Sequence, residues 1–377
     1  MKILIGADVV STSSNEDAFI SGDMSEVLDE SIFHVLNEHD YRVVNLETPL
    51  YDGHSPISKC GPNLKCPTEM VNGLQAMHIN LVTLANNHVL DHGVDGLFST
   101  KKVLTQNNIA YLGVGENTAA ARKSYIIEKE GLRIGIYGCC EHEFSCATDT
   151  TTGANPFDPI DSFDDVCHLS DAVDYVIVLY HGGKEYYRYP SPWLQKVCRK
   201  FVSSGANLVI CQHSHCVGCK EDCKNGTIIY GQGNFVFDLK DDEFWNTGLL
   251  VSLNFDAEKK CTISYIPIEK KRGRISVSRD ESILSGFNQR SRDALDPKFI
   301  QENYASFSRG YLDDYLISLS GKRNFLERAL NKFTKGKSRK YLLSRKHNNH
   351  SLTVMLNYIE CEAHRDLLIE GLKDRIM

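Results

Sequence analysis

The chain lacks any apolar run that approaches the ~18 residues a membrane-spanning helix needs. Its first residues lead directly into an apolar strand pattern, without the basic and apolar segments that make up a secretory signal peptide. Internal repeats are also absent. With 42% apolar and 24% charged residues among 377, the composition is typical of a globular protein and not of a disordered one. We therefore expect a cytoplasmic protein without a transmembrane segment.

The sequence also lacks the cysteine spacing of a disulfide framework or a zinc ribbon. Its thirteen cysteines are an odd number in a mid-sized chain, which favours reduced thiols. Cys211, Cys216, Cys219 and Cys223 lie close together in the sequence, and positions 216 and 219 have the Cys-x-x-Cys spacing of zinc and iron–sulfur sites. Because a second, separate Cys-x-x-Cys is missing and Cys211 falls in an apolar strand, a structural metal at these thiols is the weaker interpretation.

Acidic residues outnumber basic ones overall, but basic residues are in excess near the C-terminus. The net charge is −7, yet the residues from Gly286 onward contain 17 Lys and Arg against 11 Asp and Glu. The segment 322–346 holds ten basic residues and one acid, Glu327. Such a block either forms a solvated helical face or binds an anionic polymer, a nucleic acid or a membrane surface. No nucleic-acid-binding motif accompanies the charge, so we favour the solvated face and expect no specific nucleic-acid partner.

Five apolar segments predict buried strands, and each is followed by a polar side chain able to bind a metal ion. With their polar ends included, the segments are residues 3–8, 43–47, 80–88, 176–181 and 208–213. In open α/β sheets, sites form beyond the carboxyl ends of the strands. We therefore expect the five strand ends to meet at one site.

Helical and strand patterns alternate as far as residue 211, and strands then follow without long helices between them. This order predicts an α/β protein with two sheets packed as a sandwich. Beyond residue 285 the pattern is helical, so we divide the chain into a domain at 1–285 and a helical region at 286–377. The expected helices are 25–39, 68–77, 93–106, 192–203, 297–318, 323–333 and 351 to the C-terminus. After a strand at 132–137 we expect a polar loop to about residue 165 as a lid or wall of the site, and hairpin strands at 227–230, 247–255 and 262–268 that complete a second sheet.

The strand ends supply the ligand mixture of a divalent transition-metal site. Such ions bind carboxylates, amide oxygens and imidazoles, and two imidazoles share one turn at His213-Ser214-His215. In a two-metal site a carboxylate bridges the ions, and water between them becomes a nucleophile. Taken singly, each residue also has an ordinary explanation as a helix cap or a hydrogen-bonded side chain. We expect a divalent metal centre, with two ions of manganese, iron or zinc, formed by Asp8, Glu47, Asn87, His181, His213 and His215.

His88 follows Asn87 and cannot easily share its metal, so we expect it to act as a general acid that protonates a leaving oxygen. Asp91 either orients His88, as carboxylates orient imidazoles near metals, or caps the helix that follows. Lys59, in the loop 53–67, is a candidate contact for an anionic substrate. Further candidate substrate contacts, for which hydrogen bonding or turn geometry is the alternative role, are Glu185, Tyr186 and Asn234.

Five segments of the sequence resemble one known family. They are Asn45-Leu46-Glu47-Thr48-Pro49-Leu50, Asn86-Asn87-His88-Val89-Leu90-Asp91-His92-Gly93, His181-Gly182-Gly183-Lys184-Glu185-Tyr186, Gln212-His213-Ser214-His215 and Gly231-Gln232-Gly233-Asn234-Phe235. Their order over residues 1–268 is similar to that in CapA-type capsule and poly-gamma-glutamate biosynthesis proteins, of the calcineurin-like metallophosphoesterase superfamily. The resemblance implies a metallophosphatase-like αββα sandwich with metal ions at the strand ends.

The resemblance also implies roles for single residues. It gives His88 the place of the catalytic histidine. Val10 stands where the superfamily's first motif, Asp-x-His, has its histidine, and Glu47 stands where the bridging residue is usually aspartate. CapA-type proteins share both departures. The implied ligand sets are Asp8, Glu47 and His215 for one metal ion, and Glu47, Asn87, His181 and His213 for the other.

These features predict a metal-dependent hydrolase of a phosphoester, or a related ester or amide, that acts with capsule-synthesis machinery in making a surface polymer. A metal-bound hydroxide would attack an anionic small molecule or polymer, and His88 would assist the leaving group. The alternative is a non-catalytic synthesis or export factor that keeps the fold and binds an anionic polymer through the basic segment 322–346. A third, weaker hypothesis is a thiol metal protein centred on Cys216, Cys219 and Cys223.

Overall fold

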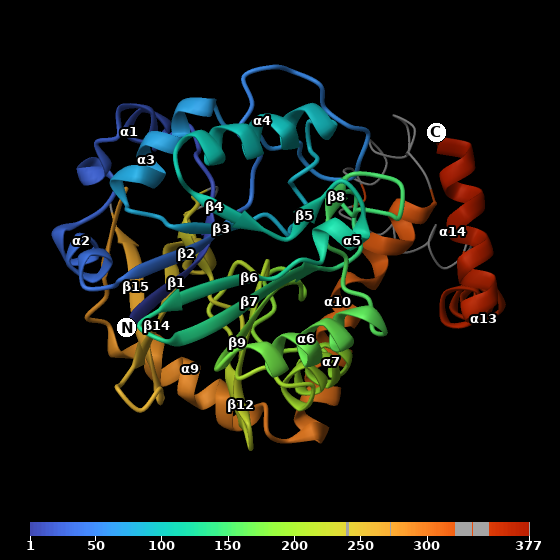
Figure 1. Ribbon diagram of the computed structural model, residues 1–377. Helices are drawn as coiled ribbons and strands as arrows, with labels where there is room; N and C mark the ends of the chain where they lie inside the picture. The colour runs from blue at the N-terminus through green and yellow to red at the C-terminus, as the bar shows by residue number, and fades with distance from the viewer. Residues whose placement is uncertain (239–240, 272, 321–333, 335–346, 377) are drawn as a thin grey trace. The chain divides into compact units, whose positions relative to one another are not determined.

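In the computed structural model, which describes residues 1–238, 241–271, 273–320, 334 and 347–376, the apolar segments form two β-sheets that face each other (Figure 1). The chain divides into two units, Met1–Gln301, which contains both sheets, and Glu302–Met377, whose described elements are helices. The predicted two-sheet α/β sandwich with a helical C-terminal region is confirmed.

The first sheet has a parallel centre. β1 pairs in parallel with β2, β2 with β3, and β3 with β4, while β13 adds in parallel to the end of β1. On its other side β1 pairs with β14 in antiparallel fashion, and β15 and β16 follow. Across the sheet the strands are β16 (Arg274–Val277), β15 (Cys261–Lys271), β14 (Thr247–Phe255), β1 (Lys2–Val9), β2 (Tyr41–Leu46), β3 (Leu81–Thr83) and β4 (Ala110–Leu112), with β13 (Asn234–Val236) beside β1.

The second sheet is also parallel at its centre, through β7, β9, β10 and β12. Antiparallel strands close both of its edges, because β11 pairs with β12 and β6 with β7. Across the sheet the strands are β11 (Lys220–Cys223), β12 (Gly226–Tyr230), β10 (Leu208–Gln212), β9 (Tyr175–His181), β7 (Leu132–Cys140) and β6 (Tyr125–Lys129), and the short strands β5 (Val114–Gly115) and β8 (Gly153–Ala154) pair separately.

Side chains alternate between the two faces of each strand, and this alternation places the hydrophobic cores. In β1, Ile3 and Ile5 pack between the sheets, whereas Leu4 packs on the side of the helices that cover the first sheet. In β9, Ile177 packs between the sheets and Val178 packs on the helix side of the second sheet. Both faces of these strands are therefore buried, which explains why they are continuously apolar in the sequence.

Helices cover the outer face of each sheet: α1, α3 and α4 lie over the first, and α6 and α7 lie against the second (Figure 1). α7 begins where local chemistry favours it, because the Ser191 hydroxyl accepts a hydrogen bond from N of Leu194 at 3.0 Å and Pro192 occupies the first helical position. The described α-helices are α1 (Glu16–Ser21), α2 (Glu30–Asn37), α3 (Val71–Ala76), α4 (Gly93–Gln106), α5 (Thr118–Ala121), α6 (Asp161–Ala172), α7 (Pro192–Ser203), α8 (Glu243–Asn246), α9 (Glu281–Asp293), α10 (Pro297–Leu319), α13 (Asn349–Glu360) and α14 (Glu362–Ile376), and the 3-10 helices are η1 (Met24–Glu26) and η2 (Thr68–Met70).

The prediction of one continuous helix over 25–39 is wrong, because α2 begins only at Glu30. Asp29 caps it by accepting a hydrogen bond from N of Ser31 at 3.0 Å. Just before the cap, Leu28 forms a β-bridge with Ile275, which keeps this residue out of a helix. The helix expected at 68–77 likewise divides into η2 and α3. α4 and α7 have the expected bounds.

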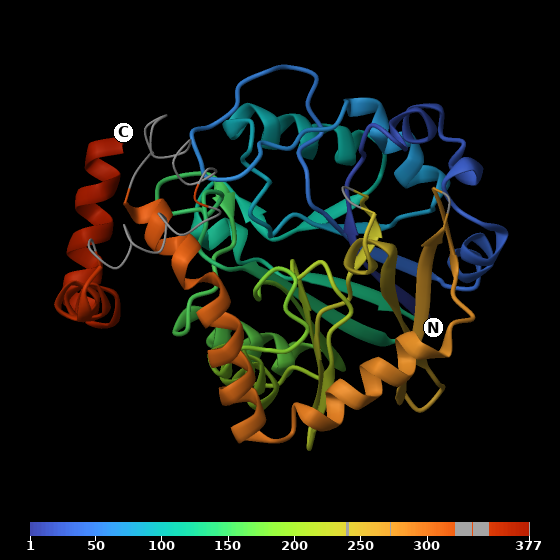
Figure 2. The same ribbon diagram turned by 180° about the vertical axis from the view of Figure 1, so that it is seen from behind.

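The prediction that all the late strands complete the second sheet is also wrong. β12 does join it beside β10, but β14 and β15 extend the first sheet beyond β1. Figure 2 shows this pair beside the N-terminus, where N of Phe255 donates a hydrogen bond to the carbonyl of Met1 at 2.9 Å. The polar loop expected to reach residue 165 is shorter than predicted, because α6 begins at Asp161 and packs Val166 and Leu169 on the second sheet.

The first unit extends past the boundary expected at residue 285. α9 belongs to it, because Phe287 is buried with its ring 5.2 Å from the ring of Tyr265. In the second unit the helix expected from 351 is divided into α13 and α14 at Cys361. The helix expected at 323–333, and the basic segment 322–346 apart from Thr334, lie outside the described residues. Among the described helices none is both long and apolar enough to cross a membrane.

His39, which follows α2, makes the stability of the first unit depend on pH. Its Nδ1 contacts the carbonyl of Val35 at 2.6 Å and its Nε2 contacts the hydroxyl of Ser252 at 2.7 Å, so it links α2 to β14. Burial lowers the pKa of His39 below the usual 6.5. The unfolded chain therefore takes up this proton more readily than the folded protein, and stability falls as the pH drops below ~6.5.

We expect the stability advantage of the parent protein over His39→Gln to shrink between about pH 7.5 and about pH 5.5. Urea unfolding at the two pH values measures it. His34→Gln is the matched control, because the His34 side chain is 75% exposed. An advantage that is equal at both pH values contradicts the expectation.

Candidate metal centre

The two sheets bring the six predicted ligand residues together at the carboxyl ends of their parallel strands. Asp8 ends β1, Glu47 follows β2, and Asn87 follows β3 in the first sheet. His181 ends β9, and the turn after β10 carries both His213 and His215 in the second sheet. All six side chains are buried, and Asp8 and Glu47 have no exposed surface at all. The prediction that distant segments converge at one site is therefore confirmed in the geometry.

One half of the cluster is centred on His215. Its Nδ1 lies 3.4 Å from Oδ2 of Asp8 and 2.9 Å from Oδ1 of Asn234. The ligand atoms of Glu47, His213 and His215 all lie within 4.8 Å of one another. This spacing allows the three side chains to share a metal ion.

The other half is centred on His181. Its Nε2 lies 3.0 Å from Oδ1 of Asn87 and 3.3 Å from Oε1 of Glu47. The same Glu47 oxygen lies 4.0 Å from Nδ1 of His213. Glu47 thus lies between the two halves of the cluster, where the resemblance placed a bridging carboxylate.

Several buried atoms of the cluster make no hydrogen bond. They are Oδ2 of Asp8, both carboxylate oxygens of Glu47 and Nδ1 of His213. A buried polar atom without a partner is costly by about 1–3 kcal/mol, so such atoms rarely gather in one place without a reason. Oxygen and imidazole nitrogen atoms are also the ligands that divalent transition metals bind. These side chains therefore fit a metal ion.

The charges in the cluster attract one another strongly. Burial raises the pKa of Glu47, but the imidazole of His181 and its neighbours outweigh burial and hold that pKa well below the ordinary value. Burial also opposes protonation of His215, yet the neighbouring carboxylates of Asp8 and Glu47 raise the pKa of His215 to about 9. The pKa of His213 is raised in the same way by Glu47. The carboxylates thus favour positive charge at the neighbouring imidazoles of His213 and His215, and a metal cation would supply positive charge at the same place.

The turn that carries the two histidines has an unusual backbone. His213 has φ 85° and His215 has φ 49°, both in the left-handed region that side chains other than glycine rarely adopt. Such conformations cost about 1–3 kcal/mol each and gather at functional sites, where the surrounding structure imposes them. The Trp245 ring stacks on the His215 ring with centroids 4.9 Å apart and an interplanar angle of 21°, and Phe237 packs edge-on against His215 at 5.6 Å. These aromatic side chains hold the imidazole in place.

His88 lies next to Asn87 and is oriented by Asp91. Nδ1 of His88 is 2.5 Å from Oδ2 of Asp91, so Nδ1 donates a hydrogen bond to the carboxylate. Nε2 of His88 takes no part in this hydrogen bond. Lys59 forms an ion pair with Oδ1 of the same carboxylate, and its Nζ lies 3.3 Å from Nδ1 of His88. Asp91 does not cap α4, whose N-cap residue is His92 and has no side-chain capping bond. Of the two roles expected for Asp91, the structure therefore favours orienting His88.

Asp91 also fastens the long loop that follows β2. Its carboxylate accepts a hydrogen bond from N of Leu64 at 2.6 Å. Its backbone carbonyl accepts hydrogen bonds from N of Ile57 at 3.1 Å and from Nδ2 of Asn63 at 2.7 Å. With Lys59, four residues of the loop 53–67 are bound to this one aspartate. The loop is thereby held next to His88.

The predicted substrate contacts have different surroundings. The Lys59 side chain is only 2% exposed and is bound to Asp91, so its role as a direct substrate contact stays a prediction. Asn234 contacts His215 and so lies at the cluster of predicted ligands itself. The ring of Tyr186 lies 6.3 Å from that of His215, and Glu185 contributes to the raised pKa of His213. Both therefore lie near the cluster, as expected, and their contact with substrate stays a prediction.

The sequence interpretation missed two asparagines that support the ligands. Nδ2 of Asn45 donates a hydrogen bond to Oδ1 of Asp8 at 2.7 Å and lies 3.1 Å from Nδ1 of His181. Nδ2 of Asn86 donates to Oδ1 of Asn45 at 3.0 Å. Both are fully buried. For Asn45 the available signal was its position inside the apolar strand β2, where strand propensity disfavours asparagine; Asn86 lies beyond the end of β3.

Val10 and the cysteines near His213 do not belong to the cluster. Val10, which stands where an Asp-x-His motif has its histidine, is buried in the hydrophobic core on the helix side of the first sheet. Sγ of Cys211 lies 3.5 Å from Sγ of Cys198, and both pack on the outer side of the second sheet. Within the described part of the chain, the one group of three or more His, Cys, Asp and Glu side chains placed to share a metal is the group of Glu47, His213 and His215. The structure therefore does not place Cys216, Cys219 and Cys223 to share a metal, and all thirteen cysteines are free thiols.

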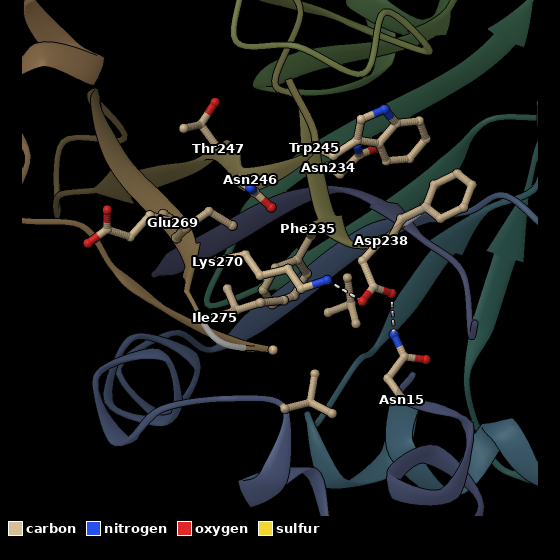
Figure 3. A pocket seen from close by; sticks show the side chains of 16 residues that line it. Asn15, Asn234, Phe235, Asp238, Trp245, Asn246, Thr247, Glu269, Lys270 and Ile275 are labelled. Carbon is tan, nitrogen blue, oxygen red and sulfur yellow. Dashed lines mark hydrogen bonds and ion pairs between the residues drawn. The ribbon is translucent and has the colours of Figure 1, made fainter. Parts of the chain in front are cut away.

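A pocket lies beside the cluster and shares Asn234 and Trp245 with its surroundings (Figure 3). Asp238 also lines this pocket. Its carboxylate accepts a hydrogen bond from Nδ2 of Asn15 at 3.2 Å and forms an ion pair with Lys270, as the dashed lines in Figure 3 show. Two hydroxyl groups of the loop after β1 also bind this carboxylate. Asp238 is thus fully occupied, and it joins the loop after β1 to β15.

The fold and the site together define an α/β sandwich protein with a buried cluster of carboxylate, amide and imidazole groups where the parallel strands of both sheets end. Residues 3–239 match the model of the family described as "Bacterial capsule synthesis protein PGA_cap", and the chain belongs to this family. The resemblance to CapA-type proteins is confirmed.

Two curated relatives are named CapA. The chain is 28% identical over 212 residues to "Capsule biosynthesis protein CapA" of Bacillus anthracis, which covers 54% of this chain and 52% of that protein. It is 28% identical over 244 residues to "PGA biosynthesis protein CapA" of Bacillus subtilis, which covers 61% of this chain and 64% of that protein. The chain thus spans between about half and two thirds of the length of these relatives.

Among solved structures, the chain is similar to "a novel phosphatase" of Mycoplasma pneumoniae, with a TM-score of 0.44, 13% identity and coverage of 72% of this chain and 95% of that one. It is also similar to a "Putative 5'-Nucleotidase" of Staphylococcus aureus, with a TM-score of 0.44, 13% identity and coverage of 76% of this chain and 58% of that one.

Proposed function

We propose that this chain is a metal-dependent hydrolase of phosphoester, or related ester or amide, bonds that acts in the synthesis of a bacterial surface polymer. The observation that carries the proposal is the group of buried Asp8, Glu47 and His213 atoms without hydrogen bonds, next to an imidazole, His88, that a carboxylate orients. Membership of the capsule synthesis family supports the link to a surface polymer.

Six side chains would hold the metal, as one ion or as two ions of manganese, iron or zinc. A bound divalent ion would polarise a phosphoryl or carbonyl oxygen and activate water for attack. Glu47 lies between the two halves of the cluster and is suited to bridge two ions. The ligand residues are Asp8, Glu47, Asn87, His181, His213 and His215.

His88 would supply the proton that the leaving group needs. Its Nδ1 is engaged by Asp91, so Nε2 is the nitrogen that exchanges a proton with substrate. Asp91 is fully buried and is itself held by Lys59 and by N of Leu64, so the ring has one preferred orientation. The substrate class is an anionic small molecule or polymer, and Glu185, Tyr186 and Asn234 lie near enough to the cluster to contact it.

Hydrolysis of p-nitrophenyl phosphate by the full chain with added Mn²⁺ tests the proposal. His88→Ala is expected to lower the rate by roughly 10²–10⁴-fold, the range for loss of a general acid, while Mn²⁺ still binds. His213→Ala is expected to lower both the rate and Mn²⁺ binding, because it removes a ligand.

His34→Ala is the matched control, since this histidine is 75% exposed on α2, and it is expected to behave like the parent. If p-nitrophenyl phosphate is still hydrolysed at the parent rate after both His88→Ala and His213→Ala, the proposed hydrolase site is refuted. A parent protein without turnover that binds an anionic polymer with a steep salt dependence would favour the non-catalytic polymer factor instead.

A further inference from the structure

A loop that follows a strand of the second sheet contacts the turn of the first sheet that contains Asn87 and His88. The loop is residues 141–146 and follows β7. At its start, N of Glu141 donates a hydrogen bond to the carbonyl of His181 at 3.0 Å, beside a predicted metal ligand. At its end, Cys146 forms a β-bridge with Ala154. The loop is thus held at both ends, and the residues between them contact Asn87.

Glu143 distinguishes the two ends of the Asn87 amide. Nδ2 of Asn87 donates a hydrogen bond to Oε2 of Glu143 at 3.0 Å, while Oδ1 of Asn87 faces Nε2 of His181 at 3.0 Å. A carboxylate accepts hydrogen bonds and donates none, so a flipped amide would set its oxygen against the oxygen of Glu143. His181 favours the same orientation, because Nδ2 of Asn45 donates to Nδ1 of His181 and so leaves Nε2 of His181 as a donor. Glu143 therefore holds the nitrogen end of the Asn87 amide away from the cluster, so that the oxygen of Asn87 faces the cluster.

Ser145 fixes the backbone of the same turn. Its side chain is fully buried. Its hydroxyl donates a hydrogen bond to the carbonyl of Asn87 at 2.7 Å and accepts one from N of Leu90 at 3.2 Å. One hydroxyl thus holds both ends of the turn that contains Asn87 and His88.

We propose that Glu143 and Ser145 are positioning residues of the metal centre, which hold the amide oxygen of Asn87 toward the metal ion. The inference rests on the proposed function in so far as it needs a metal at the cluster. An amide binds a divalent ion through its oxygen, so a residue that selects the amide orientation raises metal affinity without touching the ion. Glu143 supplies the orientation of the side chain, and Ser145 supplies the position of the backbone.

Calorimetric titration of the full chain with Mn²⁺ tests the proposal. Glu143→Ala and Ser145→Ala are each expected to weaken Mn²⁺ binding by roughly 10–100-fold, the range for residues that support metal ligands. Glu143→Gln is expected to bind Mn²⁺ nearly as well as the parent, because its side-chain oxygen still accepts the hydrogen bond from Asn87. In an Asn87→Ala background, Glu143→Ala is expected to add no further loss, because it acts through the missing amide.

Ser162→Ala is the matched control for the loss of a buried serine hydroxyl, since Ser162 is 1% exposed and its hydroxyl accepts a hydrogen bond from N of Asp158 at 3.0 Å, away from the cluster. It is expected to leave Mn²⁺ affinity unchanged. Glu143 is exposed, so its variants test the inference even if Ser145→Ala fails to fold.

Two results would overturn the positioning role while the metal centre stands. One is a loss with Glu143→Gln as large as that with Glu143→Ala, which assigns the effect to charge alone. The other is the same loss from Glu143→Ala with and without Asn87. A parent that binds Mn²⁺ with these dependences but does not hydrolyse the aryl phosphate contradicts the proposed hydrolase and leaves the positioning residues in place. If the parent protein binds no Mn²⁺, both the proposed hydrolase and the positioning role are refuted.

Discussion

Replacing Glu47 with glutamine is expected to weaken Mn²⁺ binding by more than about 100-fold, beyond the range typical for residues that only support ligands. Glu47 has no exposed surface, its two oxygens accept no hydrogen bond, and it lies within 3.3 Å of His181 and 4.0 Å of His213. The substitution keeps the shape of the side chain and removes its negative charge, so both halves of the cluster lose the anion they share. Calorimetry or equilibrium dialysis with Mn²⁺ measures the effect.

Glu221→Gln is the matched control for Glu47→Gln. Glu221 is a buried carboxylate bound to Arg199 at 2.7 Å and to the hydroxyl of Tyr230 at 3.1 Å, apart from the ligand cluster. Its variant is expected to lose stability without losing Mn²⁺ affinity. If Glu47→Gln binds Mn²⁺ as tightly as Glu221→Gln, Glu47 is not a ligand.

Replacing Lys59 with methionine is expected to lower the free energy of unfolding by about 3 kcal/mol, the lower end of the range for breaking a buried ion pair. The Lys59 and Asp91 side chains are 2% and 0% exposed, so the carboxylate would be left in a low-dielectric interior without its cation. The value lies at the lower end because His88 and N of Leu64 still bind Asp91. Urea unfolding measures the change.

Adding Asp91→Asn to Lys59→Met is expected to recover part of the lost stability, because no uncompensated charge then remains. Lys65→Met is the matched control in the same loop. Its ammonium group donates to the carbonyl of Gly53 at 2.8 Å on an exposed surface, so the change is expected to be within about 0.5 kcal/mol. A double variant that is no more stable than Lys59→Met would show that the ion pair does not explain the loss.

The sequence could predict that these polar side chains lie close together, because the ends of the strands are visible in it. Asp8, Glu47 and His181 each follow an apolar run too short for a helix, and parallel strands carry such residues to one edge of a sheet. The bounds of α7 were equally predictable, since Ser191 and Pro192 provide local signals for its start. In these cases the local pattern shows where a strand ends or a helix begins.

Other features depend on which distant segments meet, and no local pattern records that. Nothing near β14 indicates that it pairs with β1, because its apolar residues would suit either sheet. The contacts of Glu143 and Ser145 with Asn87 join segments more than fifty residues apart. Lys59 shows the same limit: a lysine in a polar loop gave no sign that Asp91 would bury it. Partner choice between distant segments is therefore what the sequence alone could not supply.

The stack of Trp245 on His215 gives the protein an intrinsic optical signal. The chain has two tryptophans, and they differ sharply, because Trp193 is 58% exposed at the start of α7 while Trp245 is 3% exposed beside the cluster. The indole emission of Trp245 therefore senses whatever happens to the imidazole beneath it, and that of Trp193 supplies an internal reference. The proposed binding of ions and substrates can thus be tested at this site by fluorescence without attaching a dye.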